Sequence, residues 1–165
     1  METKIKLKKE NILRVKLEDE NGVDTGNTIE FDLADVSLPL RVQQVQEEHK
    51  KNKNYLKMSF ALIDKKQDKS GKKFLSSNEE EKYKVLNKFY EKETEILDLI
   101  FGEGGTKKLL NGRNPYYTMF DDIMEYLEPL KPYLEDGFKK LKEDMVNKYK
   151  NVEHDNEENV LEIDE

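Results

Sequence analysis

Hydrophobic and polar positions divide the chain into a short β part followed by a long helical part. Residues 12–17 and 28–33 alternate apolar with polar side chains, the period of a strand with one buried face. The segment between them contains Asn21-Gly22 and Gly26, residue types that accept the positive φ angles of a hairpin connection. The sequence therefore predicts an N-terminal β-hairpin. Because an isolated hairpin is only marginally stable, it should pack against the rest of the chain.

After Asp35 the apolar residues recur every three or four positions, which is the period of an amphipathic helix. This spacing predicts a helix that continues to about Asp64. Asp35 or Ser37 can cap its start, and Pro39 fits its first turn, where the missing N–H has no helical partner to lose. A polar, lysine-rich break follows over residues 65–73.

A second helix is predicted from a capping box of Ser77 and Glu80 to Gly102. Thr106 is the expected cap of a short turn after it. Asn114-Pro115 should open the next helix, with Asn as the cap and Pro at the first position. The predicted buried face of that helix comprises Tyr116, Met119, Phe120, Ile123, Leu127 and Leu130.

The end of the chain completes a mostly α fold. Pro129 and Pro132 should end or kink the preceding helix, and a final amphipathic stretch follows. We predict a compact bundle of four to five helices with an N-terminal β-hairpin and a flexible acidic C-terminal tail. The predicted units are a β-hairpin region at 1–34, a helical domain at 35–150 and an acidic tail at 151–165, which we expect to be disordered.

Charge and composition exclude several functional classes. The net charge is −7, and the last fifteen residues carry seven acids without Lys or Arg, which leaves 29 charges of each sign in the body. This balance argues against binding to nucleic acid or an anionic membrane. The absence of Cys excludes disulfides, thiolate metal sites and thiol nucleophiles. No signal-peptide or membrane-spanning run is visible, so we expect a cytosolic protein.

The polar residues show no pattern of catalysis, cofactor binding or metal binding. His49 lacks a second ligand at metal-site spacing, and we expect an ordinary helix-face histidine. Residues 102–107 (GEGGTK) are glycine-rich, but they follow a predicted helix and lack the spacing of a phosphate-binding loop. Asp121 and Asp122 are adjacent, so on a helix they point about 100° apart and should not share a site. We therefore expect no enzymatic activity.

Tyr116, Tyr117 and Phe120 form the candidate binding cluster. Three aromatic residues within five positions cover more than one face of a helix, so one ring can remain exposed. Aromatic residues dominate the hot spots of protein interfaces. Two alternatives stay open, namely that all three rings belong to the core or that they anchor a protein partner.

Three segments together resemble the tail assembly chaperones of phages and prophages from low-GC Gram-positive hosts. They are residues 29–43 (IEFDLADVSLPLRVQ), 96–105 (ILDLIFGEGG) and 110–129 (LNGRNPYYTMFDDIMEYLEP). Their order and spacing are similar to the family pattern from about residue 28 to residue 134. The matching positions are turn and helix-end residues rather than chemical groups.

The resemblance implies a non-enzymatic, mostly helical protein of the host cytoplasm that needs no cofactor. It implies binding to the aggregation-prone tape measure protein during tail assembly, with the tail tube protein as a further partner. We also expect weak self-association, because coating a long client favours repeated copies. The alternatives are a structural tail or connector component of the virion and an acidic, protein-binding inhibitor.

Overall fold

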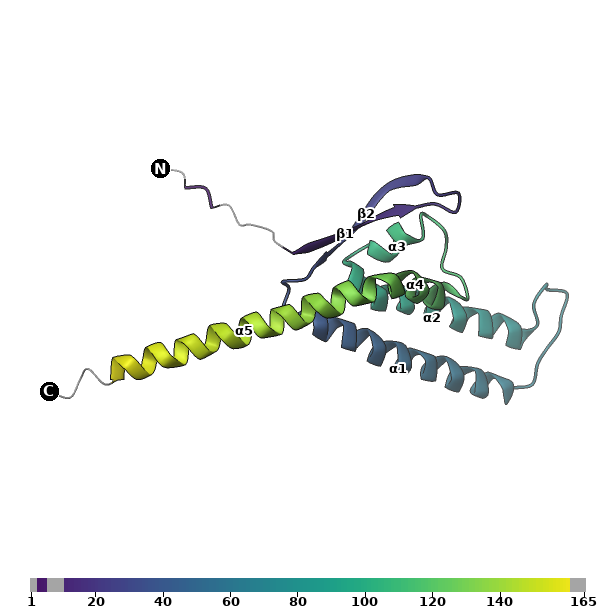
Figure 1. Ribbon diagram of the computed structural model, residues 1–165. Coiled ribbons are helices and arrows are strands. Elements are labelled where there is room, and N and C mark those ends of the chain that lie inside the picture. Colours follow the sequence, from purple (N-terminus) through teal and green to yellow (C-terminus); the bar gives the residue numbers. More distant parts are fainter. Residues whose placement is uncertain (1–2, 6–10, 161–165) are drawn as a thin grey trace.

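The computed structural model describes the backbone of residues 3–5 and 11–160. It describes the side chains of these residues up to residue 150. Helices make up 62% of the chain, and two antiparallel strands precede them, which confirms the predicted fold class (Figure 1). The elements are β1 (Ile12–Glu18), β2 (Asp24–Asp32), α1 (Leu38–Asp64), α2 (Ser77–Phe101), α3 (Gly105–Leu109), α4 (Met119–Leu127), the 3-10 turn η1 (Glu128–Leu130) and α5 (Lys131–Val160).

The β-hairpin packs on the helices through its apolar face. Leu13 pairs with Phe31 and Val15 with Ile29, so the alternating apolar residues of both strands lie on one side. Ile29 and Phe31 are buried. The ring of Phe31 meets that of Phe101 in α2 edge to face, with centroids 6.1 Å apart. The hairpin thereby gains the packing partner that an isolated two-stranded sheet needs.

Helices α1 and α2 form a long antiparallel pair that holds most of the core (Figure 1). Their connection is tied together by Asp68. Its carboxylate accepts hydrogen bonds from the Ser76 hydroxyl at 2.9 Å, the Asn78 N–H at 3.1 Å and the Ser77 hydroxyl at 3.3 Å. The capping box consists of Ser76 and Glu79, one residue earlier than predicted. The two serines offer the same spacing to an acid, but the N–H and the hydroxyl of Ser77 are bonded to the backbone of Lys69 instead.

Two other predicted helix starts are wrong. The N-cap of α3 is Gly104, while Thr106 lies inside the helix, fully buried, with its hydroxyl donating to the Thr94 carbonyl at 3.3 Å. Helix α4 begins at Met119 after Thr118 rather than at Asn114-Pro115. The residues before it are fixed by tertiary contacts that a helix would break, which are described below.

The prolines separate α4 from α5. Helix α4 ends at Leu127, Pro129 lies in η1, and Pro132 occupies the first turn of α5, where its missing N–H costs little. The first turns of α5 approach the hairpin so closely that a Cβ on Gly137 would lie 3.0 Å from the side chain of Leu33.

Farther along, α5 projects beyond the other elements, and it includes residues 151–160, the first part of the predicted acidic tail (Figure 1). Residues 161–165 of that prediction lie outside the described residues. Within residues 3–5 and 11–160, none of the helices combines the length and the apolar character needed to cross a membrane.

Candidate protein-binding surface

The three aromatic residues singled out from the sequence lie in different environments. Tyr117 is 85% exposed, whereas Tyr116 and Phe120 are half-buried. Phe120 packs against the core, and its ring stacks on His49 of α1. The structure therefore divides the cluster, with Phe120 inside and Tyr117 presented to solvent.

The backbone that carries Tyr117 is held by contacts with α2 and α4. The Tyr90 hydroxyl donates to the Tyr117 carbonyl at 2.9 Å, and the Met119 N–H donates to the Tyr116 carbonyl at 3.0 Å. The guanidinium of Arg113 lies 3.7 Å above the centre of the Tyr116 ring, within cation–π range. These contacts hold residues 113–117 outside α4. They also fix the backbone that carries the Tyr117 ring, which lowers the entropic cost of binding a partner there.

Burial raises the pKa of two half-buried tyrosines, Tyr90 of α2 and Tyr116. For Tyr90, nearby Glu93 adds to the effect of burial. For Tyr116, a hydrogen bond with Asp122 adds to it. Both hydroxyls are therefore protonated at neutral pH, so the Tyr90 hydroxyl is available as the donor that holds the Tyr117 carbonyl.

Further large side chains of α4 are exposed. Met124 and Tyr126 keep 38% and 77% of their surface accessible. Met124 and Tyr126 are two positions apart on a helix and point to opposite sides, so we use the name α4 surface for the exposed side chains of Tyr117 and Tyr126 alone. Aromatic side chains of this kind are enriched in the centres of protein interfaces.

A buried polar cluster lies beneath α4. The carboxylate of Glu93 in α2 is fully buried, and its Oε2 lies 2.7 Å from Nδ1 of His49. Asn52 Nδ2 donates to Glu93 Oε1 at 2.7 Å and to the Phe89 carbonyl at 3.0 Å. The Phe120 ring covers the imidazole in a parallel stack, with centroids 3.6 Å apart and planes 3° apart.

This cluster connects three helices through one carboxylate. Both oxygens of Glu93 have a partner on α1, which fixes the position of α1 along α2, and the stacked Phe120 ties α4 to the same point. The sequence analysis missed it. The available signal was an acid on the apolar stripe of α2, together with His49 and Asn52 three positions apart on one face of α1.

The glycine-rich loop after α2 is already occupied by a side chain of this chain. The Asp98 carboxylate accepts hydrogen bonds from the N–H groups of Gly104 at 3.1 Å and Thr106 at 2.9 Å. These are the groups that a phosphate would need. Within the described residues, His, Asp and Glu form no group of three or more that could hold a metal ion.

The three segments that carry the family resemblance meet in the structure. Phe31 of the first contacts Phe101 of the second, and Arg41 Nη1 of the first donates to the Leu99 carbonyl at 2.7 Å. The third segment supplies Tyr117 and α4. Comparison with protein-family models, with curated protein sequences and with solved structures finds no match for this chain.

Proposed function

We propose that this protein is a non-enzymatic tail assembly chaperone that binds the tape measure protein in the host cytoplasm and keeps it from aggregating. The observation that carries the proposal is the exposed ring of Tyr117 on a backbone fixed by Tyr90. It lies in the third segment of the family resemblance, so the segment that suggests the family also supplies the candidate surface.

The physical properties of the α4 surface suit a long helical client. An amphipathic helix exposes an apolar stripe, and rigid aromatic side chains can bury such a stripe with little loss of conformational freedom. The net charge of −7 favours a complex that stays in solution after the apolar groups are covered. The tail tube protein would then replace the chaperone as it polymerises around the client.

Co-expression with the tape measure protein tests this function. The expected result is that the client stays in the supernatant and co-purifies in a complex with several copies of the chaperone. The double variant Tyr117→Ala/Tyr126→Ala should lose at least about tenfold of the client recovery, because hot-spot aromatics commonly account for more than 1 kcal/mol each.

The matched control is Phe74→Ala. Phe74 is fully exposed in the α1–α2 connection, at the far end of the helical pair from the hairpin (Figure 1). Its removal should leave client recovery unchanged. An insoluble client beside free wild-type protein contradicts the chaperone function. Recovery that depends on Phe74 and not on the tyrosines contradicts the choice of surface.

Purified virions distinguish the chief alternative. A chaperone is released before the tail is complete, so virions should contain none of this protein. Stoichiometric amounts in washed virions would instead identify a structural tail or connector component.

A further inference from the structure

The projecting half of α5 carries apolar side chains that the rest of the chain leaves exposed. Met145, Val146 and Tyr149 retain 39%, 45% and 66% of their accessible surface. Figure 1 shows this part of the helix extending beyond the hairpin and the other helices. Apolar residues are costly on an isolated helix unless another surface covers them.

The charge along this helix changes sign at its middle. Residues 139–150 contain five lysines and two acids, whereas residues 151–160 contain four acids and neither Lys nor Arg. A parallel pair of such helices would place like charges side by side. An antiparallel pair places the basic half of each helix against the acidic half of the other, which is favourable in both halves.

We propose that α5 pairs with α5 of a second copy of this chain in an antiparallel, twofold symmetric dimer. The twofold axis lies at the charge boundary between Lys150 and Asn151. In that register position 145 of one copy lies opposite position 156 of the other, and position 149 opposite position 152. The proposal does not depend on the proposed function.

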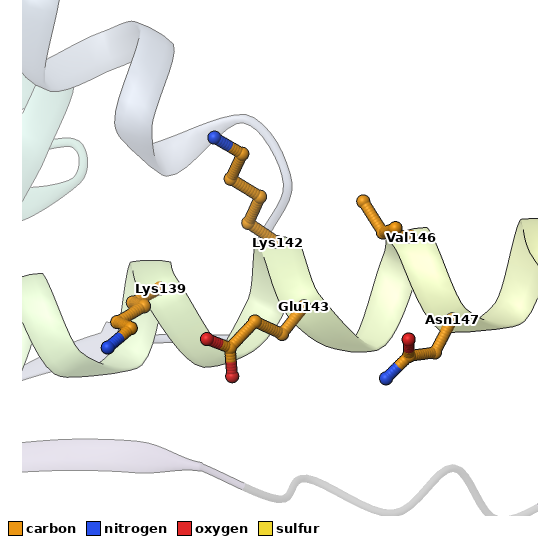
Figure 2. Close-up of a pocket in the computed structure, with 5 residues that line it drawn as sticks. All are labelled: Lys139, Lys142, Glu143, Val146 and Asn147. Carbon is orange, nitrogen blue, oxygen red and sulfur yellow. The ribbon is translucent and has the colours of Figure 1, made fainter.

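The surface of α5 also has a hollow beside the stripe of Met145 and Tyr149. Figure 2 shows Lys139, Lys142, Glu143, Val146 and Asn147 around it, all on this one helix. At 100° per residue these positions centre about 100° around the helix from Met145 and Tyr149. A hollow on a single helix cannot enclose a small ligand, and only its Lys142 and Val146 border the stripe of Met145 and Tyr149 that makes the proposed contact.

The expected affinity is modest. One pair of short helical segments buries less surface than a standard stable interface, so we expect a dissociation constant on the order of 10 µM. Since charges at exposed positions contribute, raising the salt concentration from about 50 mM to about 500 mM should weaken the dimer several-fold.

Cysteine cross-linking tests the geometry, because the chain contains no cysteine of its own. Under mild oxidation the Asn151→Cys variant should form a disulfide-linked dimer through its position at the axis. A mixture of Met145→Cys with a size-tagged Asn156→Cys variant should form the mixed dimer. Met145→Cys alone should stay monomeric, because its two copies would lie eleven residues apart along the helix, or about 16 Å.

Phe74→Cys serves as the control for random collisions, since Phe74 is fully exposed and far from α5. Efficient cross-linking of Met145→Cys with itself would overturn the antiparallel arrangement. Cross-linking of Asn151→Cys no faster than that of Phe74→Cys would overturn the dimer.

Sedimentation equilibrium of the unmodified full-length protein measures the association itself. The double variant Val146→Glu/Tyr149→Glu should dimerise at least about tenfold more weakly, because each substitution places a charge in the apolar contact. The control Tyr83→Glu adds a charge at an exposed position of α2 and should not change the dissociation constant.

Protein concentrations of several hundred micromolar (well above the roughly 10 µM dissociation constant expected) should give the dimer at low salt. A wild-type protein that remains monomeric under these conditions would overturn the proposal. Client recovery would then still report separately on the chaperone function. Conversely, a dimer that forms normally beside an insoluble client would contradict the chaperone function alone.

Discussion

The fully buried carboxylate of Glu93 determines how α1, α2 and α4 fit together. Moving a carboxylate out of water costs several kcal/mol, and only close partners on both oxygens offset that cost. His49 and Asn52 supply these partners from one face of α1. A shift of α1 along α2 by one residue would separate Glu93 from both His49 and Asn52. The cluster therefore selects one register of the helical pair.

Replacing His49 by alanine should destabilise the protein by about 3 kcal/mol, because it leaves a buried carboxylate oxygen without its partner. It also removes the ring on which Phe120 stacks. Urea unfolding followed by circular dichroism measures the change. The neighbouring Lys50→Ala, at an exposed position, should keep the wild-type midpoint. Equal midpoints for both variants would show that the cluster does not fix the helices.

A second acid, Asp35, joins the hairpin to α1. Its Oδ1 accepts hydrogen bonds from the Ser37 hydroxyl at 2.7 Å and the Ser37 N–H at 2.8 Å, and its Oδ2 pairs with Arg41. The bonds from Ser37 are the main cause that lowers the pKa of Asp35 below its usual value of 3.8, and Arg41 adds to the effect.

The lowered pKa predicts the direction of a pH effect. The ionised form is favoured in the folded state, so its contribution to stability is present above pH 3.8 and disappears as the pH falls through the lower pKa of the folded state. Asp35→Asn should therefore lower the urea midpoint at pH 7 and differ progressively less from wild type as the pH falls below 3.8. A difference that stays constant across this pH range would exclude this ionisation as the cause.

At the scale of elements, the junction of α2 and α3 depends on close backbone approach. Gly102 and Gly104 have φ angles of 82° and 72°, a region that favours glycine, and they reverse the chain after α2. Asp98 then accepts the free N–H groups of the turn. Gly102, which the sequence analysis placed at the end of the second helix, and Gly104 therefore also allow Thr106 to become buried against α2.

Gly105→Ala tests this close approach. A Cβ at position 105 would lie 2.5 Å from the Cβ of Phe101, a distance that real atoms do not tolerate. Although alanine favours helices, the displacement of α3 should cost about 2 kcal/mol of unfolding free energy. Gly71→Ala is the matched control, because nothing lies within 4 Å of its added Cβ. A neutral Gly105→Ala in urea unfolding would mean that α3 shifts freely.

At the scale of the whole molecule, stability should decrease from the α1–α2 pair toward the free end of α5. The core residues come from the hairpin, α1, α2 and α4, and Leu134 and Phe138 are the last residues of α5 that pack against them. Beyond Leu141 the helix relies on its own hydrogen bonds. An isolated helix of that length is marginal in water.

Hydrogen exchange measures this gradient. In dilute solution, where the proposed dimer dissociates, the amides of residues 142–150 should exchange at least about a hundredfold faster than those of residues 93–101. At high protein concentration the first group should slow down as the α5 helices pair. Equal protection of both segments in the dilute sample would contradict a free α5.

Local signals in the sequence were sufficient for most of the elements. Alternation placed the hairpin, and the three-to-four spacing placed α1 and α2 because each buries a single apolar stripe. Local signals failed where two equivalent choices existed. Ser76 and Ser77 are each followed three residues later by a glutamate, and they differ in that Ser77 exchanges hydrogen bonds with Lys69, eight residues earlier.

The candidate surface was predictable only in part. The sequence identified Tyr116, Tyr117 and Phe120 as an aromatic cluster, since three rings cannot all lie on one helix face. Which ring is exposed depends on Tyr90 and His49, which approach from other helices. Tyr126 was not singled out, because the prediction rested on three aromatic residues within five positions and Tyr126 lies outside that window.

The sequence by itself thus determined the hairpin, the helical periods, the neutral body and the acidic end, because these follow from residue types at fixed spacing. Tertiary structure decided the pairing of Glu93 with His49, 44 residues apart in the chain, and the separation of Tyr117 from Phe120. It also decided that the later part of α5 projects from the body. These features depend on contacts between residues that are distant in sequence. A buried polar group needs such a partner only once the helices have packed around it.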